Sequence, residues 1–279
     1  MGKVLSDSKL EKLLKKGTLE FYPKVEKQQI KPASIDLRLG RVYDEFGNEL
    51  NADSEGWYHL IPKTKYYVET LERVRTDSNK NYSFYIIPRS SFSRALINIS
   101  PTDGNYSMRE LTKPENIKCS LENGPFNINV RRGDTIVQLV VIKGSNSPAR
   151  SFYFQGREMR HPLANKAVAP ANGVRDDELF LNIPIDCVVD KNTPIKYISD
   201  GRLNYSDAKH AAIVYSTDYG SKINVSYVDP GYSGTLFGLF MTGGSPQKIN
   251  LKGKLLKIQE YEIHGKVKKD YNKSDSHYK

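Results

Sequence analysis

Cysteine, histidine and long apolar runs are scarce in this chain, and each scarcity argues against a class of protein. Two cysteines, Cys119 and Cys187, are too few for a disulfide framework and favour a reducing compartment. The apolar runs are strand-sized, as at Leu139–Ile142, whereas a membrane-spanning helix needs about 20 apolar residues. The first residues lack the apolar core of a secretion signal. We therefore expect a cytoplasmic protein without a membrane partner.

Positive charge is in excess, with a formal net charge of +10 at pH 7. Part of it lies in four lysines between positions 9 and 16, and part in the tail that follows His264. A basic protein can bind nucleic acid, a nucleoside triphosphate or nothing in particular. The sequence has no zinc finger and no aromatic-rich RNA-binding signature. Nucleic-acid binding is therefore an alternative that rests on charge alone, and solvated lysine faces are the simpler interpretation.

The pattern of apolar residues predicts a mostly β fold with one short helix near the start. Residues 6–17 read as the helix, because Ser6 or Asp7 can cap it, leucines form one apolar stripe, and Gly17 is a natural stop. Short alternating runs separated by Gly, Asn, Asp and Pro then predict strands. These predicted strands are Tyr66–Thr70, Ser83–Ile87, Asn127–Val130 and Thr135–Ile142.

The periodicity fails in the middle of the chain, where prolines and glycines are frequent. We interpret this stretch as a linker or lid between two β domains. The predicted division is a first domain over 1–143, the linker or lid over 144–177, a second domain over 178–265 and a basic tail over 266–279.

The two halves look like distant copies of one unit. The first ends in a strand, a basic pair beside Gly133 and a second strand, and the second half repeats this order around Gly253. The repeat is imperfect, but it predicts an internal duplication.

Two short motifs carry the strongest chemical signal. Residues 31–40 read KPASIDLRLG, in which alternation predicts a half-buried strand that ends at a turn glycine, Gly40, with Asp36 and Arg38 facing outward. Residues 88–94 read PRSSFSR, which places two arginines and three hydroxyls directly after an apolar run. Such a cluster offers bidentate donors and small hydrogen-bonding groups to a polyanion.

In this order and spacing, the two motifs resemble the signature of the dCTP deaminase and dUTPase superfamily. The second half contributes Val228–Gly234, VDPGYSG, which resembles the acidic motif of the same superfamily. Its counterpart in the first half, around Asp103, looks degenerate, and the second half has no RSSxxR. The arrangement is most similar to the tandem-repeat dCTP deaminases. It implies two dUTPase-like distorted β-barrel domains of the β-clip type, with a short N-terminal helix.

The resemblance also implies which residues of the RSSxxR motif bind substrate. Arg89 and Ser91 would hold the phosphates of a deoxynucleoside triphosphate. Ser90 and Arg94 would position the base and the attacking water. A fixed guanidinium fork suits phosphate oxygens, and a serine hydroxyl can orient water.

The acidic motif would complete the same site from the second half of the chain. The resemblance implies that Asp229 meets the sugar or activates water, and that Tyr232 stacks against the deoxyribose. In single-domain relatives the sites lie between the subunits of a trimer. One composite site could therefore form within this chain, and that hypothesis requires Ser90 and Asp229 to lie close together.

Two segments resemble the closing tail of the family. One is the C-terminal segment 268–279, which carries Tyr278, and the other is Tyr153–Arg157, which carries Gln155. Either could fold over the bound triphosphate.

A glutamate that acts as general base in the family is missing from its expected place. Ten residues after Asp229 lies Leu239, and the aligned place in the first half offers Cys119 or Ser120. Glu122 is nearby and is the candidate base, with Glu115 a poorer one. Loss of a general base costs about 10²–10⁴-fold in rate.

Other chemistries lack their motifs in this sequence. Zinc deaminases need a His-x-Glu and a Pro-Cys-x-x-Cys, and neither is present. The five histidines show no metal-ligand spacing, and no glycine-rich phosphate loop occurs. Any Mg²⁺ would arrive with the triphosphate.

The favoured function is hydrolytic deamination of dCTP to dUTP and ammonia, by zinc-independent attack of water at C4. A dUTP diphosphatase, which forms dUMP and pyrophosphate, is the alternative because it does not need the missing glutamate. A catalytically inactive deoxynucleotide-binding regulator is the second alternative. By the same resemblance we expect a homo-oligomer, either a trimer of tandem chains or a dimer.

Overall fold

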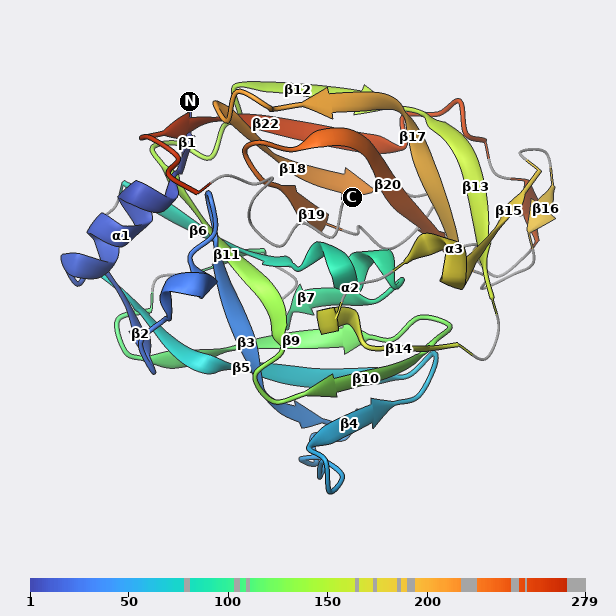
Figure 1. Ribbon diagram of the computed structural model, residues 1–279, viewed down its shortest axis with the longest axis horizontal. Helices are drawn as coiled ribbons and strands as arrows, with labels where there is room; N and C mark the ends of the chain where they lie inside the picture. The colour runs from blue at the N-terminus through green and yellow to red at the C-terminus, as the bar shows by residue number, and fades with distance from the viewer. Residues whose placement is uncertain are drawn as a thin grey trace.

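Figure 1 shows the fold, which is a computed structural model. The described residues are 1–77, 81–102, 106–108, 111–163, 166–172, 175–184, 187–189, 194–216, 225–241, 246–248 and 250–269.

The elements follow one another in two groups along the chain. The first group is β1 (Lys3–Leu5), α1 (Asp7–Lys15), β2 (Leu19–Tyr22), η1 (Lys27–Gln29), β3 (Ile35–Tyr43), β4 (Trp57–Leu60), β5 (Lys65–Thr76), β6 (Tyr82–Pro88), α2 (Ser90–Arg94), β7 (Asn98–Pro101), β8 (Ser107–Met108), β9 (Glu115–Glu122), β10 (Asn127–Arg131) and β11 (Thr135–Lys143). The second group is β12 (Arg150–Phe154), β13 (Gly156–Pro162), β14 (Ala167–Val168), η2 (Pro170–Asn172), α3 (Asp176–Leu179), β15 (Phe180–Ile183), β16 (Val188–Val189), β17 (Pro194–Asn204), β18 (His210–Ser216), β19 (Val225–Val228), β20 (Ser233–Met241), β21 (Gln247–Lys248) and β22 (Leu256–His264).

The short strand β1 joins the two halves of the molecule. It pairs antiparallel with β11 of the first half and parallel with β22 of the second half. The main sheet therefore runs without a break in the order β19-β18-β22-β1-β11-β3-β5-β9-β7. The three residues of β1 thereby bring β11 and β22, which are remote in sequence, into one sheet.

The predicted mostly β fold and N-terminal helix are confirmed. Helix α1 buries Leu10 and Leu13 on one face, as its apolar stripe predicts, and Gly17 follows it with a positive φ of 69°. Ser6 stands at the N-cap position but makes no side-chain capping bond. The four predicted strands correspond to β5, β6, β10 and β11.

Strand β3 differs from its prediction at the glycine. Gly40 does not end the strand but lies inside it, where the register against β5 shifts. A Cβ at Gly40 would lie 2.9 Å from the Thr70 carbonyl oxygen. The glycine therefore permits a close approach of two backbones, which is a second common use of this residue in strands.

The segment predicted as a linker or lid, 144–177, contains several paired strands. Strand β12 pairs with β22, and β13 pairs with β15 and β17, so both belong to the sheets of the second half. Strand β14 instead pairs with β10 of the first half. The segment crosses between the halves as structured strands. The sequence does not reveal these strands, because the stretch is rich in exposed polar residues and prolines. Along β12, for example, burial alternates only weakly.

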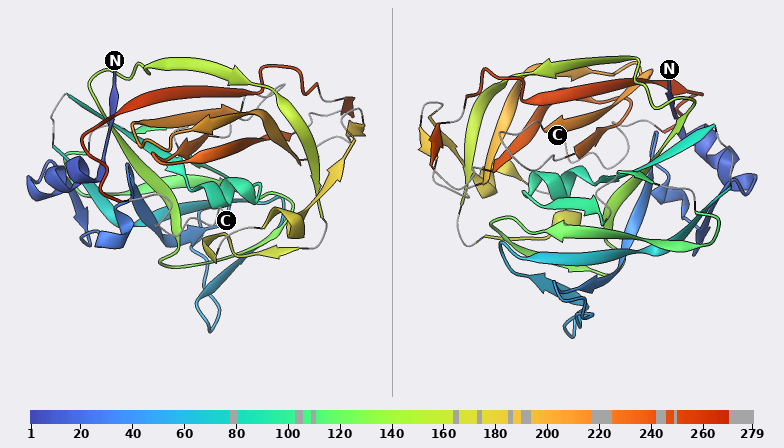
Figure 2. Two further views of the ribbon diagram at one scale, coloured as in Figure 1. Left: turned by 45° about the horizontal axis from the view of Figure 1, so that its top comes forward. Right: turned by 180° about the vertical axis from the view of Figure 1, so that it is seen from behind.

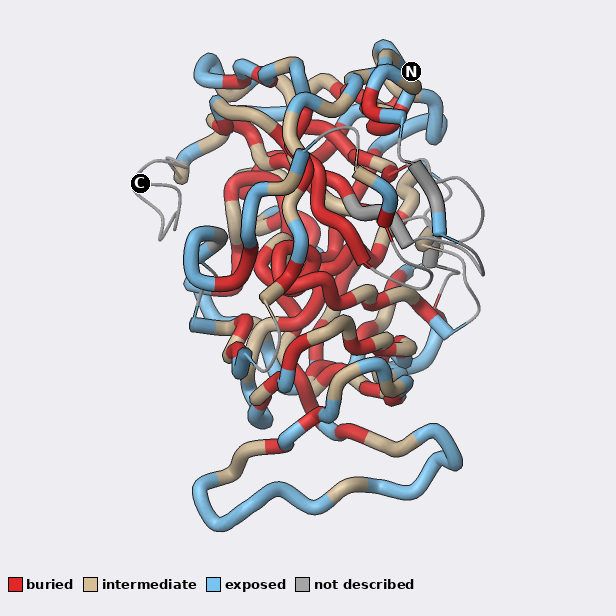
Figure 3. The backbone as a smooth tube through the Cα atoms, turned by 90° about the vertical axis from the view of Figure 1, so that its right-hand side faces the viewer, coloured by how far each residue is buried: buried red, intermediate tan, exposed pale blue. Residues whose placement is uncertain are grey.

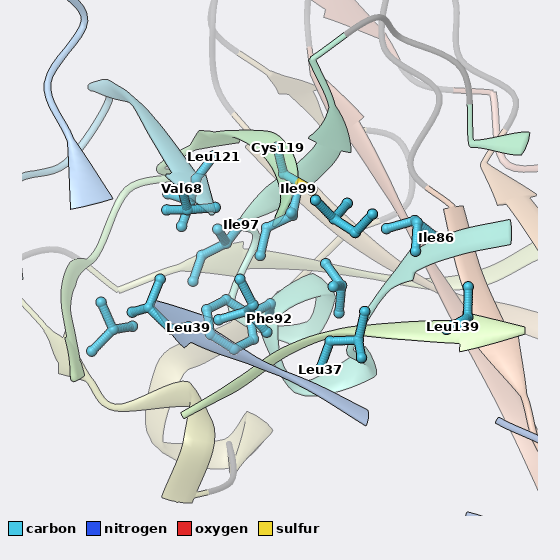
Figure 4. Packing of buried hydrophobic residues seen from close by; sticks show 14 of the residues in the cluster. Leu37, Leu39, Val68, Ile86, Phe92, Ile97, Ile99, Cys119, Leu121 and Leu139 are labelled. Atoms are coloured by element: carbon cyan, nitrogen blue, oxygen red, sulfur yellow. The ribbon is translucent and has the colours of Figure 1, made fainter. Parts of the chain in front are cut away.

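Each half has its own core of buried apolar side chains. The first core packs Leu37, Leu39 and Phe92 among strands β3, β7, β9 and β11 (Figure 4). The second core includes Tyr197 and Ile258. A third cluster lies between them and contains side chains of β1, β6, β11, β18, β19 and β22. Buried residues consequently form a continuous band through the middle of the molecule (Figure 3).

Helix α2 lies in the middle of the molecule, between the sheets of the two halves (Figure 2). It contacts β7 of the first half and β19 of the second. Within the described residues, none of the helices is long and apolar enough to cross a membrane.

Candidate functional site

The RSSxxR motif folds into the short helix α2. Strand β6 ends at Pro88, and Arg89 is the extended residue at the N-cap, where its N–H donates to the Ile136 carbonyl at 3.0 Å. Ser91 and Arg94 are buried, while Arg89 and Ser90 are half-buried. The motif is therefore an ordered helical turn tied to β11, and not a free polar loop.

Asp36 is buried on β3, although alternation predicted that it faces outward. The residue is 3% exposed. Its Oδ1 accepts a hydrogen bond from Gln138 Nε2 at 3.1 Å, and its Oδ2 lies 3.5 Å from Lys31 Nζ. Burial raises the pKa of Asp36, and the positive charges of Lys31 and Arg89 oppose this rise. Both faces of β3 are covered here. The polar side chain of Asp36 therefore lies among other site residues and not in water.

Arg38, two residues along, has a different role. Its Nε donates to the fully buried Glu72 at 2.6 Å, and its guanidinium also pairs with Glu26 at 2.7 Å. Arg38 therefore stabilises β3 by binding two carboxylates, and no contact joins it to the site residues among those described.

Asp229 reaches this place from the second half of the chain. It follows β19, and Tyr227 of that strand donates its hydroxyl hydrogen to the Ala33 carbonyl at 3.3 Å. Burial and the negative charge of Asp36 raise the pKa of Asp229 to about 7, while Lys31 acts in the opposite direction. We name the residues Lys31, Asp36, Arg89, Gln138 and Asp229 the carboxylate cluster.

Three buried polar atoms around α2 have no hydrogen-bond partner among the described residues. They are Ser91 Oγ on the helix, Asn98 Oδ1 on β7 and Asp229 Oδ1 after β19. Because β7 and β19 both contact α2, these atoms come from adjoining elements. Buried polar atoms rarely stay unpaired, so the arrangement suits a ligand or water that completes their hydrogen bonds.

Glu122 lies on a strand that adjoins the site. It ends β9, where its Cα partner on β7 is Asn98, which carries one of the unpartnered atoms. Burial raises the pKa of Tyr106, and the negative charge of Glu122 adds to this rise. The charges that act on Asp229 are those of Asp36 and Lys31.

Two further predicted residues take up positions in the second half. Tyr232 is buried in the second core, where its hydroxyl donates to the Thr235 carbonyl at 2.5 Å. Gln155 is exposed at the corner between β12 and β13, and its N–H donates to Asp200 Oδ1 at 3.0 Å. In Figure 1 this corner belongs to the outer part of the second half, away from α2. The Tyr232 N–H donates to the Asp229 carbonyl at 3.3 Å, so the backbone of Tyr232 adjoins the carboxylate cluster, and its sugar contact remains a prediction. The lid role of Gln155 also remains a prediction.

The C-terminal segment reaches the rim of the carboxylate cluster. The buried carboxylate of Asp7 accepts the backbone N–H of Lys268 at 3.0 Å and of Lys269 at 2.9 Å. Lys269 Nζ donates to the carbonyls of Ile30 and Lys27. The segment thus ends beside Lys31. Tyr278 lies outside the described residues.

Sequence reasoning missed Lys31 and Gln138 and undervalued Asp36. The signal for Gln138 was present, since a glutamine inside the apolar run Val137–Ile142 has to find a partner when buried. The described residues hold no group of three or more His, Cys, Asp or Glu side chains arranged for a metal ion.

Comparison with known proteins gives one family and two relatives. A probable deoxyuridine 5′-triphosphate nucleotidohydrolase of Methanothermobacter thermautotrophicus is 28% identical over 156 residues, which cover 51% of this chain and 96% of the relative. The crystal structure of 2′-deoxycytidine 5′-triphosphate deaminase from Agrobacterium tumefaciens matches with a TM-score of 0.74 and 14% identity. That match covers 94% of this chain and 99% of the other. The family model for dCTP deaminase-like proteins matches residues 4–144, a span that contains the KPASIDLRLG strand and the RSSxxR helix. The chain belongs to the dCTP deaminase-like family.

Proposed function

We propose that this protein hydrolyses dUTP to dUMP and pyrophosphate, with Asp229 as the general base. The observation that carries the proposal is the half-buried Asp229, whose buried Oδ1 has no hydrogen-bond partner among the described residues and whose carboxyl group is subject to the charges of Asp36 and Lys31. A general base works best when its pKa is near the operating pH, and a carboxyl with a pKa of about 7 meets that condition.

In the proposed reaction, Asp229 takes one proton from a water molecule while the water oxygen forms a bond to the α-phosphorus. The bond between that phosphorus and the bridging oxygen to the β-phosphate breaks, and pyrophosphate leaves with the electron pair. Arg89 and Ser91 hold the phosphates, since a guanidinium fork and a buried hydroxyl both donate to phosphate oxygens. Gln138 keeps Asp36 in place from β11. Mg²⁺ enters as part of the substrate, bound to the triphosphate.

Deamination of dCTP is the second candidate, and it rests on Glu122. The similar structure from Agrobacterium tumefaciens is a dCTP deaminase, and Glu122 lies on β9, next to the strand that α2 contacts. We favour hydrolysis at phosphorus because Asp229 combines a raised pKa with a buried Oδ1 that has no hydrogen-bond partner among the described residues, and Glu122 carries no such atom.

The composite site needs only one chain, because α2 and β19 belong to the same molecule. The described part of the C-terminal segment is anchored at Asp7, and Lys269 reaches the backbone of Ile30, directly before Lys31. The rest of the predicted closing tail, 270–279, lies outside the described residues. Assembly into a homo-oligomer remains part of this proposal.

The test is to incubate the purified protein with dUTP and, separately, with dCTP in the presence of Mg²⁺, and to separate the products by chromatography. We expect dUMP and pyrophosphate from dUTP. Formation of dUTP from dCTP would instead support the deaminase, and Glu122→Gln would then be expected to abolish it. If both nucleotides bind and neither changes, the protein is a nucleotide-binding regulator and the proposed hydrolysis is wrong.

A further inference from the structure

We propose that Lys31 is a positioning residue whose ammonium group is the fixed counter-ion of Asp36 and Asp229. In this role it favours the ionised form of the Asp229 carboxyl. The inference rests on the proposed function, because it assigns to Lys31 a role in the reaction of Asp229.

The first argument is the rigidity of the backbone that carries Lys31. Ile30 and Ile35 form an antiparallel bridge, and the Lys31 N–H donates to the Ser34 carbonyl at 2.8 Å. The next two carbonyls of this turn are also bonded. Pro32 accepts the Asp7 N–H at 2.8 Å, and Ala33 accepts the Tyr227 hydroxyl at 3.3 Å.

These bonds come from separate parts of the molecule, namely α1, β19 and the C-terminal segment. Lys269 Nζ adds a bond to the Ile30 carbonyl, and Gln138 Nε2 donates to Ser34 Oγ at 3.3 Å. A lysine on a mobile loop would act weakly on the carboxyl groups, because motion of its backbone and side chain would vary its distance from them. Here the backbone is held on several sides, which makes Lys31 a preorganised charge.

The second argument is the balance of charge around the two carboxyl groups. Three groups act on Asp36 of β3. They are Lys31 from the turn just before β3, Arg89 from the start of α2 and Gln138 from β11. Asp229 faces Asp36 and Lys31, and Tyr227 lies beside it on β19. Two carboxyl groups that interact at close range hold a proton between them unless a cation compensates.

Lys31 is the cation that acts on both carboxyl groups, and its side chain is 28% exposed. Arg89 acts on Asp36 but is also the proposed phosphate ligand, so its charge is shared with substrate. Lys269 donates to the carbonyl oxygens of Lys27 and Ile30, and burial together with the positive charge of Lys31 lowers the pKa of Lys269. Lys269 is therefore engaged with the backbone, and Lys31 is a cation within ion-pair distance of Asp36.

The experiment measures the pH profile of kcat/KM for dUTP hydrolysis in wild type and in Lys31→Met. We expect the acid limb of the variant to move up by about one pH unit, so that its rate is about tenfold lower at pH 6 and converges on wild type at high pH. Lys31→Arg should restore the limb. Lys27→Met is the matched control, because it removes the same charge from an exposed lysine four residues away, and it should leave the limb unchanged.

A compensating pair keeps the test independent of folding defects in one variant. Asp36→Asn removes the neighbouring negative charge and should move the limb down, and the double variant with Lys31→Met should return it toward wild type. A uniform loss of rate at every pH in Lys31→Met, without a moved limb, would overturn the proposal and make Lys31 a phosphate ligand or a structural residue.

Failure of the proposed function is recognisable separately. If wild type does not hydrolyse dUTP, the same variants are compared in calorimetric titrations with the non-hydrolysable α,β-imido-dUTP between pH 5.5 and 9. The charge of the carboxyl pair affects the affinity for an anion. A pH dependence of the dissociation constant that shifts in Lys31→Met, but not in Lys27→Met, would therefore still support the counter-ion role. An unmoved dependence would overturn it.

Discussion

The hydroxyl of Tyr227 donates to the carbonyl oxygen of Ala33 at 3.3 Å, across the boundary between the two halves. Tyr227 lies two residues before Asp229, and Ala33 lies three residues before Asp36. One hydrogen bond therefore aligns the two segments that carry the carboxyl pair. Both partners are buried, so water does not compete readily for the bond.

Removal of this bond should impair catalysis more than folding. In Tyr227→Phe the ring still fills its buried position, and we expect a loss of about 0.5–1.5 kcal/mol in the free energy of unfolding. The Asp229 segment loses its alignment with Asp36, so kcat should fall by about tenfold while KM changes little. Steady-state kinetics with dUTP and urea denaturation provide the two measurements. An unchanged kcat would show that the bond has no role in positioning.

Loss of the proposed base should remove most of the activity. Asp229→Asn keeps the shape of the side chain but cannot accept a proton, and we expect kcat to fall by about 10²–10⁴-fold. Binding of α,β-imido-dUTP, measured by calorimetry, should remain. Asp207→Asn is the control, because Asp207 is exposed beside Lys209 and should be inert. A residual activity above a tenth of wild type would contradict the role of Asp229.

The wild-type reaction should depend on pH near neutrality. Because the pKa of Asp229 is raised to about 7, the ionised base predominates above that pH and becomes protonated below it. We expect kcat/KM to rise with pH up to about 7 and to fall tenfold per pH unit on the acid side. A profile of kcat/KM from pH 5 to 9 tests this, and a rate that stays level down to pH 5 would show an unperturbed carboxyl group.

The same raised pKa makes Asp229 costly for stability. The group is ionised in the unfolded chain above about pH 4 but remains protonated in the folded chain until about pH 7, so its contribution to stability is lost as the pH rises between these values. Asp229→Asn should therefore be more stable than wild type at pH 8, by up to about 4 kcal/mol, with little difference at pH 4. Thermal unfolding at the two pH values measures this. Equal stability at pH 8 would contradict the buried charge.

The C-terminal anchor can be released by one substitution. In Asp7→Ala the backbone N–H groups of Lys268 and Lys269 lose their acceptor, so we expect faster tryptic cleavage in 266–269 and a several-fold higher KM for dUTP. Glu11→Gln is the matched control, since it removes only the outer ion pair with Lys268, and such pairs contribute little. Limited proteolysis with mass spectrometry and kinetics give the readouts. Identical cleavage in both variants would exclude Asp7 as the anchor.

Local patterns in the sequence predicted the mostly β fold, the helix that ends at Gly17, and the strands β5, β6, β10 and β11. These features depend on alternation, caps and turn residues, which are properties of short segments. The RSSxxR motif was also identified, although its helical form was not. The strands within 144–177 were not predicted, and β12 among them is stabilised by β22, a partner more than 90 residues away that no local pattern reveals.

The carboxylate cluster was beyond the reach of local patterns. Alternation along β3 predicts that Asp36 faces water, and only the packing of Gln138, Lys31 and the segment before Asp229 against it buries that face. The signal in Lys31 was weaker still, because a lysine in a turn is ordinarily solvated. A charged residue in a strand that is covered on both sides can be recognised only when the sheet order is known.

The position of β1 has a consequence for the order of folding. This strand pairs in register with residues 262–264 of β22, so its second partner is synthesised some 260 residues later. Until then, one edge of β1 is unpaired, and an open edge can pair with another chain. The first half can collapse on its own core, but the continuous sheet closes only when the last strand arrives. Such distant pairing slows folding, so nascent or truncated chains that lack β22 should be prone to association.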